Sequence, residues 1–505
     1  MPREFTKPEV AALIELNSKF LGVSTSSILT GEGHSHPGQQ MKEYGLIVVG
    51  TGAGMNVVDS ALERGLKVAI VEEGPVGGTC LNRGCIPSKV LVHVADVIRE
   101  AEEAAKIGVS LKVESVDYKR IKERMWDIVL TGRGEMETSL KQVKDIDFYN
   151  TIGTFVSEYT MQVGDETIKA PKIVLASGAR AQIPSIPGLD KVKYHTYRTV
   201  FGIEEKPESI IILGGGYIGC EFAHFFSAIG TRVVVVGRNP VLLPHEEPET
   251  SLLVKRRLSQ HAEVHTGTDT IKADAKDGRI TVTIKDSAEK VERTVEAQHL
   301  LVATGVRSNS DWLRPEISGV KTDGKGWITT DQYLETSKPN IFALGDALGR
   351  NMYRHTANYE ASVVRNNLFE EHKVMLDLHA VPHAVFTDPQ VGQVGMTEEE
   401  AKQGRKVMVG VSRYFDSAMG YAYGDEDTFA KVIVEYPSGK ILGATVVGPQ
   451  ASTLVQQVVN LMNSENQTYA PLARAQIIHP ALSEVLASAF GRLRPANFEL
   501  DHHHH

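Results

Sequence analysis

The sequence predicts an α/β protein: two domains built on parallel sheets, followed by a C-terminal α+β domain. A unit of apolar strand, glycine-rich turn, helix and second strand occurs twice, beginning near Gly45 and near Ser209. Apolar strands that end in small-residue turns recur after each unit, at VLASG (residues 174–178) and LLVATG (residues 300–305). From about residue 383 the pattern changes to paired strands. Strands that alternate with helices favour parallel sheets, and the later pairs favour an antiparallel one.

The length and composition limit the classes of protein to consider. A chain of 505 residues is long enough for several domains of roughly 150 residues each. With 54 basic and 63 acidic residues the net charge is −9, which disfavours a nucleic-acid or anionic-membrane surface. We find no apolar run near the roughly 20 residues of a membrane span, and no secretory signal pattern. Three cysteines cannot form a disulfide framework, so we expect a reducing compartment and a cytoplasmic location.

The first unit contains the turn GTGAGM at residues 50–55. Gly50 allows a tight turn, and Gly52 lets a helix N-terminus approach a pyrophosphate. Glu72 ends the next strand, where its carboxylate would accept a hydrogen bond from a ribose hydroxyl. Met55 stands at the third position of G-x-G-x-x-G, so helix and strand must pack differently there; an ordinary strand–helix turn is the alternative. The strand, helix and second strand are predicted over residues 45–50, 56–64 and 67–72.

The second unit contains the complete turn GGGYIG at residues 214–219. Two such units imply two nucleotides, most simply a flavin and a nicotinamide dinucleotide. NAD-specific sites place an acidic residue at the end of the second strand, but here Gly237 is followed by Arg238, which suits a 2′-phosphate. Pro244 falls near the place of a second arginine, and a lone surface arginine is the alternative. The elements are predicted over residues 209–216, 217–229 and 232–236.

The C-terminal region is predicted as antiparallel strands over residues 429–435 and 440–447, around the turn Pro-Ser-Gly at 437–439, followed by helices.

Two cysteines, Cys80 and Cys85, lie five residues apart just after the first unit. A metal site would need further Cys or His ligands nearby, and the remaining cysteine, Cys220, lies in the second predicted helix, so we predict no metal site. Two inert core thiols are another alternative. A thiol pair beside a flavin-type turn favours redox chemistry, and a helix beginning near Cys85 would stabilise a thiolate there.

Four motifs carry a resemblance to a known family. GGTCLNRGCIPSK at residues 77–89 is highly specific, and LVATGVR at 301–307, NIFALGDA at 340–347 and HPALSE at 479–484 support it. On these motifs, residues 42–498 resemble the FAD-dependent pyridine nucleotide–disulfide oxidoreductases of class I. The group includes dihydrolipoamide dehydrogenases, glutathione and mycothione reductases, and mercuric reductases. The resemblance implies two Rossmann-like domains, for FAD and NAD(P), and a C-terminal dimerisation domain.

The resemblance also implies catalytic roles. Cys85 would be the flavin-proximal charge-transfer thiol, and Cys80 the interchange thiol that forms a mixed disulfide with substrate. His479 would act as general acid/base toward the substrate thiol, oriented by Glu484. In the family this pair comes from the other subunit of a homodimer, so we expect a homodimer with shared active sites.

Three further residues match positions near the flavin. Lys89 and Glu221 match an ion pair beside the flavin ring, where charge would tune its reduction potential; an exposed, solvated pair is the alternative. Tyr217 corresponds to the aromatic residue that gates the nicotinamide pocket, and a packed tyrosine is its alternative. The residues predicted for FAD are Gly50, Gly52, Glu72, Thr79, Lys89, Gly153, Gly178, Asp346 and Ala347, and those for NAD(P) are Gly214, Gly216, Tyr217, Gly219, Arg238 and Gly305.

The motifs leave the disulfide substrate open. Residues 485–505 hold no cysteine, which argues against a mercuric reductase. The form Cys-Ile-Pro-Ser-Lys favours dihydrolipoamide, as a small molecule or on a lipoyl protein. An NADPH-dependent reductase of a mycothione- or glutathione-like disulfide is the alternative, and Arg238 supports it. A non-catalytic, redox-sensing flavoprotein is a third hypothesis, which the presence of both cysteines and of His479 disfavours.

These observations divide the chain into six segments. Residues 1–40 are an N-terminal extension or appended arm, 41–189 the first part of the FAD domain, 190–311 the NAD(P) domain, 312–382 the second part of the FAD domain, 383–498 the dimerisation domain, and 499–505 a tag remnant.

Overall fold

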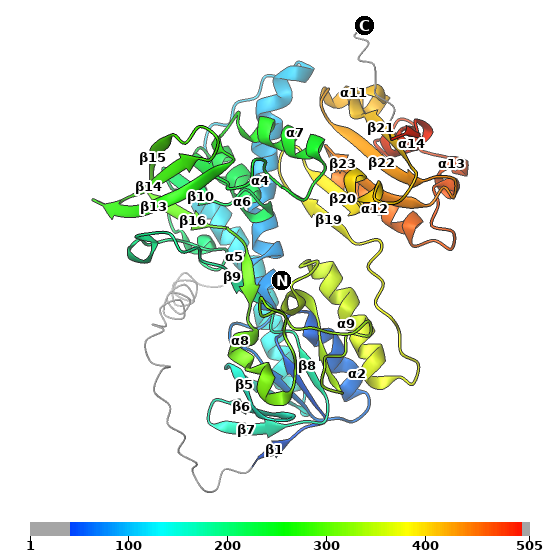
Figure 1. Cartoon of the computed structure of the whole chain (residues 1–505). Coiled ribbons are helices and arrows are strands. Elements are labelled where there is room, and N and C mark those ends of the chain that lie inside the picture. Colours follow the sequence, from blue (N-terminus) through cyan, green and yellow to red (C-terminus); the bar gives the residue numbers. More distant parts are fainter. Residues whose placement is uncertain (1–40, 497–505) are drawn as a thin grey trace, which may run out of the picture.

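The computed structural model describes residues 41–496. The predicted N-terminal arm and tag remnant lie outside the described residues. Figure 1 shows three bodies: one around β8 (Ile173–Leu175), one around β10 (Ser209–Leu213) and β16 (His299–Val302), and one around β22 (Phe429–Glu435) and β23 (Ile441–Val447). Each has its own sheet, and the first two sheets are parallel, so the predicted α/β class with a C-terminal α+β domain is confirmed.

The first body is built on a five-stranded parallel sheet of order β18-β8-β2-β3-β4. The edge strand β18 belongs to the segment that follows the second body in the sequence. A segment distant in sequence therefore completes this sheet. A smaller sheet of order β1-β7-β6-β5 lies beside it. The strands are β1 (Lys42–Glu43), β2 (Leu46–Val49), β3 (Val68–Val71), β4 (Ile146–Tyr149), β5 (Gly153–Ser157), β6 (Thr160–Val163), β7 (Glu166–Lys169), β8 (Ile173–Leu175) and β18 (Ile341–Ala343).

Helices of the first body also reach the second. In Figure 1, α4 and α5 extend beyond the first sheet, and α4 packs against both α5 and α6. The helices are α2 (Val58–Leu62), α3 (Gly78–Arg83), α4 (Cys85–Glu103), α5 (Tyr118–Gln142), α8 (Ser310–Leu313) and α9 (Arg354–Phe369), with 3₁₀ turns η2 (Ala53–Val57), η3 (Ala104–Ile107), η6 (Pro315–Ser318) and η7 (Gly345–Leu348).

The second body has a four-stranded parallel sheet of order β12-β11-β10-β16 and an antiparallel sheet of order β13-β14-β15. A two-stranded ribbon of β9 and β17 lies where the chain enters and leaves it. Its elements are β9 (Ala179–Ala181), η4 (Leu189–Lys191), η5 (Val200–Gly202), β10 (Ser209–Leu213), α6 (Tyr217–Ala228), β11 (Arg232–Val236), α7 (Pro248–Leu258), β12 (Glu263–His265), β13 (Thr268–Lys276), β14 (Arg279–Asp286), β15 (Glu292–Ala297), β16 (His299–Val302) and β17 (Val306–Ser308).

The third body is a six-stranded antiparallel sheet of order β19-β20-β23-β22-β21-β24. α12 packs against β20 and β23, and α14 packs against β21 and β22. Its elements are β19 (Pro382–Val385), β20 (Val391–Gly395), α10 (Glu398–Ala401), β21 (Val407–Arg413), η8 (Tyr414–Asp416), α11 (Ala418–Tyr423), β22 (Phe429–Glu435), β23 (Ile441–Val447), α12 (Ala451–Met462), α13 (Ala470–Arg474), α14 (Ser483–Gly491) and β24 (Arg494–Pro495).

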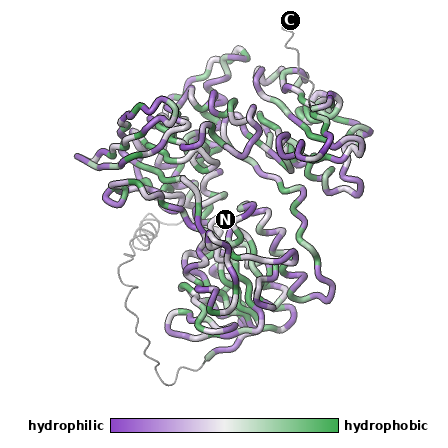
Figure 2. Tube along the Cα trace, in the orientation of Figure 1, coloured by the Kyte–Doolittle hydropathy of each residue, from purple (hydrophilic) through white to green (hydrophobic). Residues whose placement is uncertain are grey.

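The cores follow the apolar strands. All four residues of β2 and of β3 are buried, as are all seven of β23. In Figure 2 the hydrophobic segments run through the middle of each body, and hydrophilic segments lie along the outer loops. Within residues 41–496, no helix combines the length and the apolar character needed to cross a membrane.

One predicted element differs from the structure. The helix expected over residues 56–64 starts as the 3₁₀ turn η2, and the α-helical part is only the five residues of α2. Met55 lies inside η2, half-buried against the first core. In this turn Gly54 makes the close approach to the strand, since a Cβ there would lie 3.0 Å from Val48 Cγ1 and from Ala176 Cβ, and Met55 packs against the first core.

Candidate functional site

A single cavity of about 2500 Å³ is lined by residues of all three bodies. It brings both glycine turns and both cysteines together. The predicted residues that line it are Gly50, Gly52, Glu72, Thr79, Cys80, Cys85, Lys89, Gly153, Gly178, Gly214, Gly216, Tyr217, Glu221, Arg238, Gly305 and Asp346. Four predicted residues are not part of its lining: Gly219, Ala347, His479 and Glu484.

The first turn fixes a carboxylate at the edge of this cavity. The backbone N–H and the hydroxyl of Thr51 both donate to Glu72 Oε2, at 2.9 and 2.6 Å. Gly74 N donates to Glu72 Oε1 at 3.0 Å, and Gly77 N donates to the Thr51 hydroxyl at 2.9 Å. Glu72 therefore ties β3, the turn after β2 and the start of the cysteine segment to one another. Its carboxylate stands at the end of β3, where the sequence predicts a ribose contact.

The second turn brings its helix close to its strand. α6 begins at Tyr217, directly after the turn. A Cβ atom on Gly219 would lie 2.0 Å from the Gly214 carbonyl oxygen, so only glycine fits there. A Cβ on Gly216 would meet nothing within 4 Å, and this residue lines the cavity. Gly219 thus serves the packing of the turn, whereas Gly216 leaves open space in front of the α6 N-terminus.

Polar groups without protein partners lie beside the first turn. Among the described residues, the hydroxyls of Ser177 and Thr356 are buried without a hydrogen-bond partner, and both residues line the cavity. Burial raises the pKa of Asp346, which also lines the cavity, to about 6. Ala347 is fully buried in the first core, so its side chain does not reach the cavity. Buried polar atoms without partners are rare, and a polar ligand at this place would satisfy them.

The two cysteines stand at a break between helices. Cys80 lies within α3, and Cys85 is the first residue of α4, as predicted. The two thiols share a hydrogen bond, which lowers the pKa of Cys80 to about 7; the positive charges of Arg354 and Lys89 add to the effect. The same bond, together with burial, raises the pKa of Cys85. Because the two thiols titrate as a pair, the site favours a single thiolate that the other thiol stabilises.

Which of the two sulfurs carries the thiolate stays a prediction. Cys85 begins α4, where the helix N-terminus would stabilise a thiolate.

Lys89 and Glu221 form an ion pair across α4 and α6. Lys89 Nζ lies 2.5 Å from Glu221 Oε2, and it also lies over the Phe386 ring, 4.4 Å from the centroid. The backbone N–H of Phe386 donates to Glu221 Oε1 at 3.1 Å. The side chains are 34% and 13% exposed, so this pair is partly buried and joins all three bodies at the cavity wall, rather than being a solvated surface pair.

Arg354 was not found from the sequence. It is the first residue of α9 and lines the cavity. A Cβ on Gly52 would lie 3.7 Å from Arg354 Nη1, so its guanidinium stands over the first turn, and its charge also lowers the pKa of Cys80. The one sequence signal is a basic residue at the start of the helix that follows the Asp346 motif.

His479 and Glu484 form a pair at the start of α14. His479 Nδ1 lies 2.8 Å from Glu484 Oε1, and Ala481 N donates to Glu484 Oε2 at 3.0 Å. The contact with His479 lowers the pKa of Glu484. The His479 side chain is 71% exposed, and among the described residues none beyond Asn463 lines the cavity. The structure therefore pairs these two residues but does not bring them to the cysteines of the same chain.

Arg238 follows the end of β11 and is exposed at the cavity wall. The preceding Gly237 is buried, and a Cβ there would make ordinary contacts of 3.6 Å or more with Gly215. Pro244 and His245 also line the cavity.

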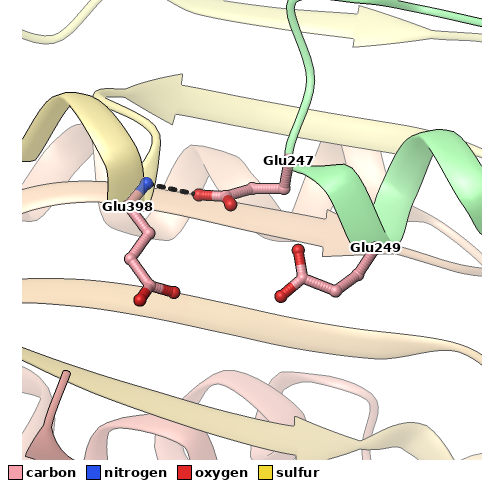
Figure 3. A group of neighbouring side chains, drawn as sticks. All are labelled: Glu247, Glu249 and Glu398. Carbon is pink, nitrogen blue, oxygen red and sulfur yellow. Dashed lines mark hydrogen bonds between the residues drawn. The ribbon is translucent and has the colours of Figure 1, made fainter. Parts of the chain in front are cut away.

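Three carboxylates gather away from the cysteines, between α7 and the third body. Figure 3 shows Glu247, Glu249 and Glu398, which lie close enough to hold a metal ion. However, the buried ammonium of Lys431 stands among them, 2.9, 3.1 and 2.7 Å from their oxygens. Burial acts to lower the pKa of Lys431, but the attraction of the carboxylates outweighs it and raises the pKa. The group is therefore an ion-pair cluster that joins the second body to the third.

Comparison with known proteins agrees with this geometry. Residues 44–362 match the family described as pyridine nucleotide-disulphide oxidoreductase, and residues 381–490 match the dimerisation domain of that family. A mycothione reductase from Mycobacterium tuberculosis is 36% identical over 471 residues, which cover 90% of this chain and 100% of that protein. A dihydrolipoyl dehydrogenase from Chlamydia muridarum is 32% identical, covering 88% and 96%. The structure of the HOCl-induced flavoprotein disulfide reductase RclA from Escherichia coli, as a Cu(II) complex, matches with a TM-score of 0.80 and 26% identity, covering 89% and 99%.

Proposed function

Because the chain belongs to the pyridine nucleotide-disulphide oxidoreductase family, we propose that it reduces a low-molecular-weight disulfide with electrons from NADPH. The family is FAD-dependent and uses NAD(P)H. The observation that carries the proposal is the Cys80–Cys85 pair in a cavity shared with both glycine turns. The cavity suits FAD: the first turn and Glu72 offer pyrophosphate and ribose contacts, and Asp346 stands beside unpartnered hydroxyls.

Bound FAD would supply the two-electron transfer between NADPH and the cysteine pair. The protein's own residues carry out the thiol chemistry. The Cys80 thiolate attacks one sulfur of the substrate disulfide, forms a mixed disulfide and releases the first substrate thiol. Cys85 then attacks the Cys80 sulfur, releases the second thiol and closes the Cys80–Cys85 disulfide. The pKa of about 7 at Cys80 supports its role as the attacking sulfur.

We infer that the leaving thiolate takes its proton from His479 of a partner subunit. His479 is exposed and held by Glu484, as a general acid that serves another chain would be. The match of residues 381–490 to a dimerisation domain supports a homodimer. Each active site of the dimer would then combine the cysteines of one subunit with the His479–Glu484 pair of the other.

Three observations bear on the substrate. Arg238 at the cavity wall, next to Gly237, supports NADPH and hence the reductive direction. The sequence Cys-Ile-Pro-Ser-Lys and the similarity to dihydrolipoyl dehydrogenases support a second candidate, dihydrolipoamide oxidised with NAD⁺.

A substrate panel with both dinucleotides separates the two candidates. We expect turnover of a mycothione- or glutathione-like disulfide with NADPH to exceed dihydrolipoamide turnover with NAD⁺. The reverse order would support the second candidate, and turnover of neither would support a sensor. Cys80→Ser and Cys85→Ser should each abolish disulfide turnover and leave FAD bound, because both sulfurs are needed for the exchange. Cys220→Ser, at a buried cysteine, is the matched control.

Mixed dimers test the shared site. A Cys85→Ser chain and a His479→Ala chain should each be inactive, the latter by about a hundredfold or more. After refolding together, each mixed dimer should regain one intact site. If the re-formed mixed dimers showed no recovery, the proposed partner role of His479 would be wrong.

A further inference from the structure

Tyr217 is held by residues of the other two bodies. Its hydroxyl lies 3.5 Å from the Tyr353 hydroxyl and 3.5 Å from His383 Nε2. Its ring packs on both, with centroids 6.4 and 5.6 Å apart, and the Tyr353 and His383 rings stack on one another at 5.4 Å. Tyr217 begins α6, Tyr353 precedes α9 and His383 lies in β19, so the cluster joins three parts of the chain that are distant in sequence.

A buried carboxylate completes this cluster. Glu246 Oε1 lies 2.7 Å from His383 Nε2, and the Glu246 side chain is fully buried. Burial and the negative charge of Glu246 both raise the pKa of Tyr217, so this hydroxyl keeps its proton and can donate it. Glu246 Oε2 is buried without a hydrogen-bond partner among the described residues, which leaves an acceptor free in the cluster.

Glu246 cannot move with Tyr217, because the next residue is anchored to the third body. Glu247 accepts from the buried Lys431 ammonium at 2.9 Å and from the backbone N–H of Glu398 at 2.7 Å. Figure 3 shows this second contact at the start of α7. The hydroxyl of Tyr217 therefore contacts groups that are fixed by the packing of the second body on the third.

We propose that Glu246, His383 and Tyr353 form a latch for Tyr217, and that this latch sets the affinity for the nicotinamide dinucleotide. The inference rests on the proposed function with a nicotinamide dinucleotide, and on the correspondence of Tyr217 to the aromatic residue that gates the nicotinamide pocket in the family. A gate must leave its contacts when the nicotinamide ring enters. The free energy of those contacts is therefore subtracted from the binding of NADP(H) or NAD(H). Glu246, His383 and Tyr353 are positioning residues, since they act through Tyr217.

The latch predicts tighter binding when it is removed. In the FAD-loaded enzyme, Tyr353→Phe and His383→Ala should each lower the Kd of NADP⁺ by about two- to fivefold, because weak polar contacts no longer oppose opening. His383→Gln should bind NADP⁺ with the wild-type Kd, because the glutamine amide can still bridge Glu246 and Tyr217. In steady state the KM for NADPH should fall without a rise in kcat. The flavin fluorescence of the loaded enzyme should also change, since removal of the latch frees the Tyr217 ring to move in the cavity.

Two controls isolate the latch. His224→Ala removes another histidine–carboxylate pair of α6, with Asp96 at 2.9 Å, and Tyr118→Phe removes a hydroxyl that donates to the Ile203 carbonyl at 3.1 Å. Neither residue lines the cavity, so neither variant should tighten binding.

Calorimetry with NADP⁺, without any disulfide, gives the deciding measurement. An unchanged or higher Kd in Tyr353→Phe, with normal FAD content and melting temperature, would overturn the latch. That variant keeps the ring and decides the matter even if His383→Ala fails to fold. If the wild type bound NADP⁺ but reduced no disulfide, the proposed function would be wrong. The Kd values of the variants would still decide whether the latch exists. If the wild type bound neither dinucleotide, both would fail.

Discussion

The two glycine turns begin alike and then differ. A Cβ on Gly50 would lie 2.2 Å from the Ala176 carbonyl oxygen, and one on Gly214 would lie 2.2 Å from that of Ala303. Both residues have positive φ angles, of 101° and 122°. The first glycine therefore meets the same demand in both domains: the backbone of the neighbouring strand leaves no room for a side chain.

The third position separates the two turns. In the second turn Gly219 lies against the Gly214 carbonyl, and α6 runs for twelve residues from Tyr217. In the first turn Met55 takes this place, a 3₁₀ turn intervenes, and α2 has five residues. The comparison teaches that the tight turn depends on the first glycine in both domains, whereas the close contact after it is made by Gly219 in the second turn and by Gly54 in the first.

The ends of the second strands differ as well. The first domain places the carboxylate of Glu72 there, and its Oε2 accepts a hydrogen bond from the Thr51 hydroxyl at 2.6 Å. The second places Gly237 and the exposed Arg238 there. One position thus offers an acceptor for a ribose hydroxyl, and the other offers space and positive charge for a phosphate.

Gly219→Ala should have the largest effect. The added Cβ would meet the Gly214 carbonyl oxygen, a backbone atom that cannot turn aside, so α6 must shift away from β10. We expect NADP⁺ affinity to fall by about a hundredfold or more, because the α6 N-terminus leaves its place. Calorimetry on the FAD-loaded protein measures this loss.

Gly202→Ala is the matched control, since a Cβ there meets nothing within 4 Å and the residue is exposed. FAD content should stay normal in both variants. If Gly219→Ala bound NADP⁺ as the wild type does, the close approach of helix and strand would not matter for binding.

Local patterns in the sequence predicted the parts of the fold that local chemistry determines. The strand at 232–236 and the helix beginning at Tyr217 lie where the glycine turn and the apolar run place them. The start of the first helix was misplaced, because it depends on how Met55 packs against the first core. Side-chain packing between elements leaves no periodic signal in the sequence.

The residues of the candidate site also fall into two groups: those in contiguous motifs, and those that distant segments bring to the cavity. The cysteines and glycine turns are contiguous motifs and could be read directly. Arg354, His383 and Glu246 could not, because each acts through a contact with a segment far away in the chain. The hydrogen bond between the two thiols was also not predicted, since it depends on how two side chains meet in the folded chain.

Arg238→Ala should change the choice of dinucleotide in the second domain. Charge-assisted hydrogen bonds from Arg238 to a 2′-phosphate are worth roughly 1.5–3 kcal/mol. We therefore expect kcat/KM for NADPH to fall about ten- to a hundredfold, with little change for NADH, and the wild type to accept NADPH at least comparably to NADH. Steady-state kinetics with both dinucleotides provide the ratio. A strong NADH preference that the substitution leaves unchanged would show Arg238 to be a surface residue only.

The second domain should also be sensitive to acid at the His195–His299 pair. Burial and the charge of His299 lower the pKa of His195 to about 4, from about 6.5 in an unfolded chain. The unfolded state then binds more protons than the folded state, so stability is lost as the pH falls from about 6.5 to about 4. The loss is about 2 kcal/mol at pH 5.

Thermal melting from pH 7 to pH 5 measures this loss. His195→Gln should melt with a smaller decrease than the wild type, and the exposed His372→Gln should melt as the wild type does. An equal decrease in all three proteins would place the acid sensitivity elsewhere.

Met55→Gly should have the smallest effect, and it tests the comparison of the two turns most directly. If Met55 merely fills space beside the first core, its loss removes apolar contacts and adds backbone freedom, which costs about 1–2 kcal/mol of stability. FAD affinity should change by less than about threefold, because Gly50, Gly52 and Glu72 form the predicted contacts. Met55→Leu keeps the volume and should cost less than about 1.5 kcal/mol. Denaturant unfolding and FAD titration measure the two quantities. A marked gain in FAD affinity in Met55→Gly would instead mean that the methionine holds the helix away from the pyrophosphate site. The 3₁₀ turn would then weaken FAD binding, and the two glycine turns would not be equally suited to a dinucleotide.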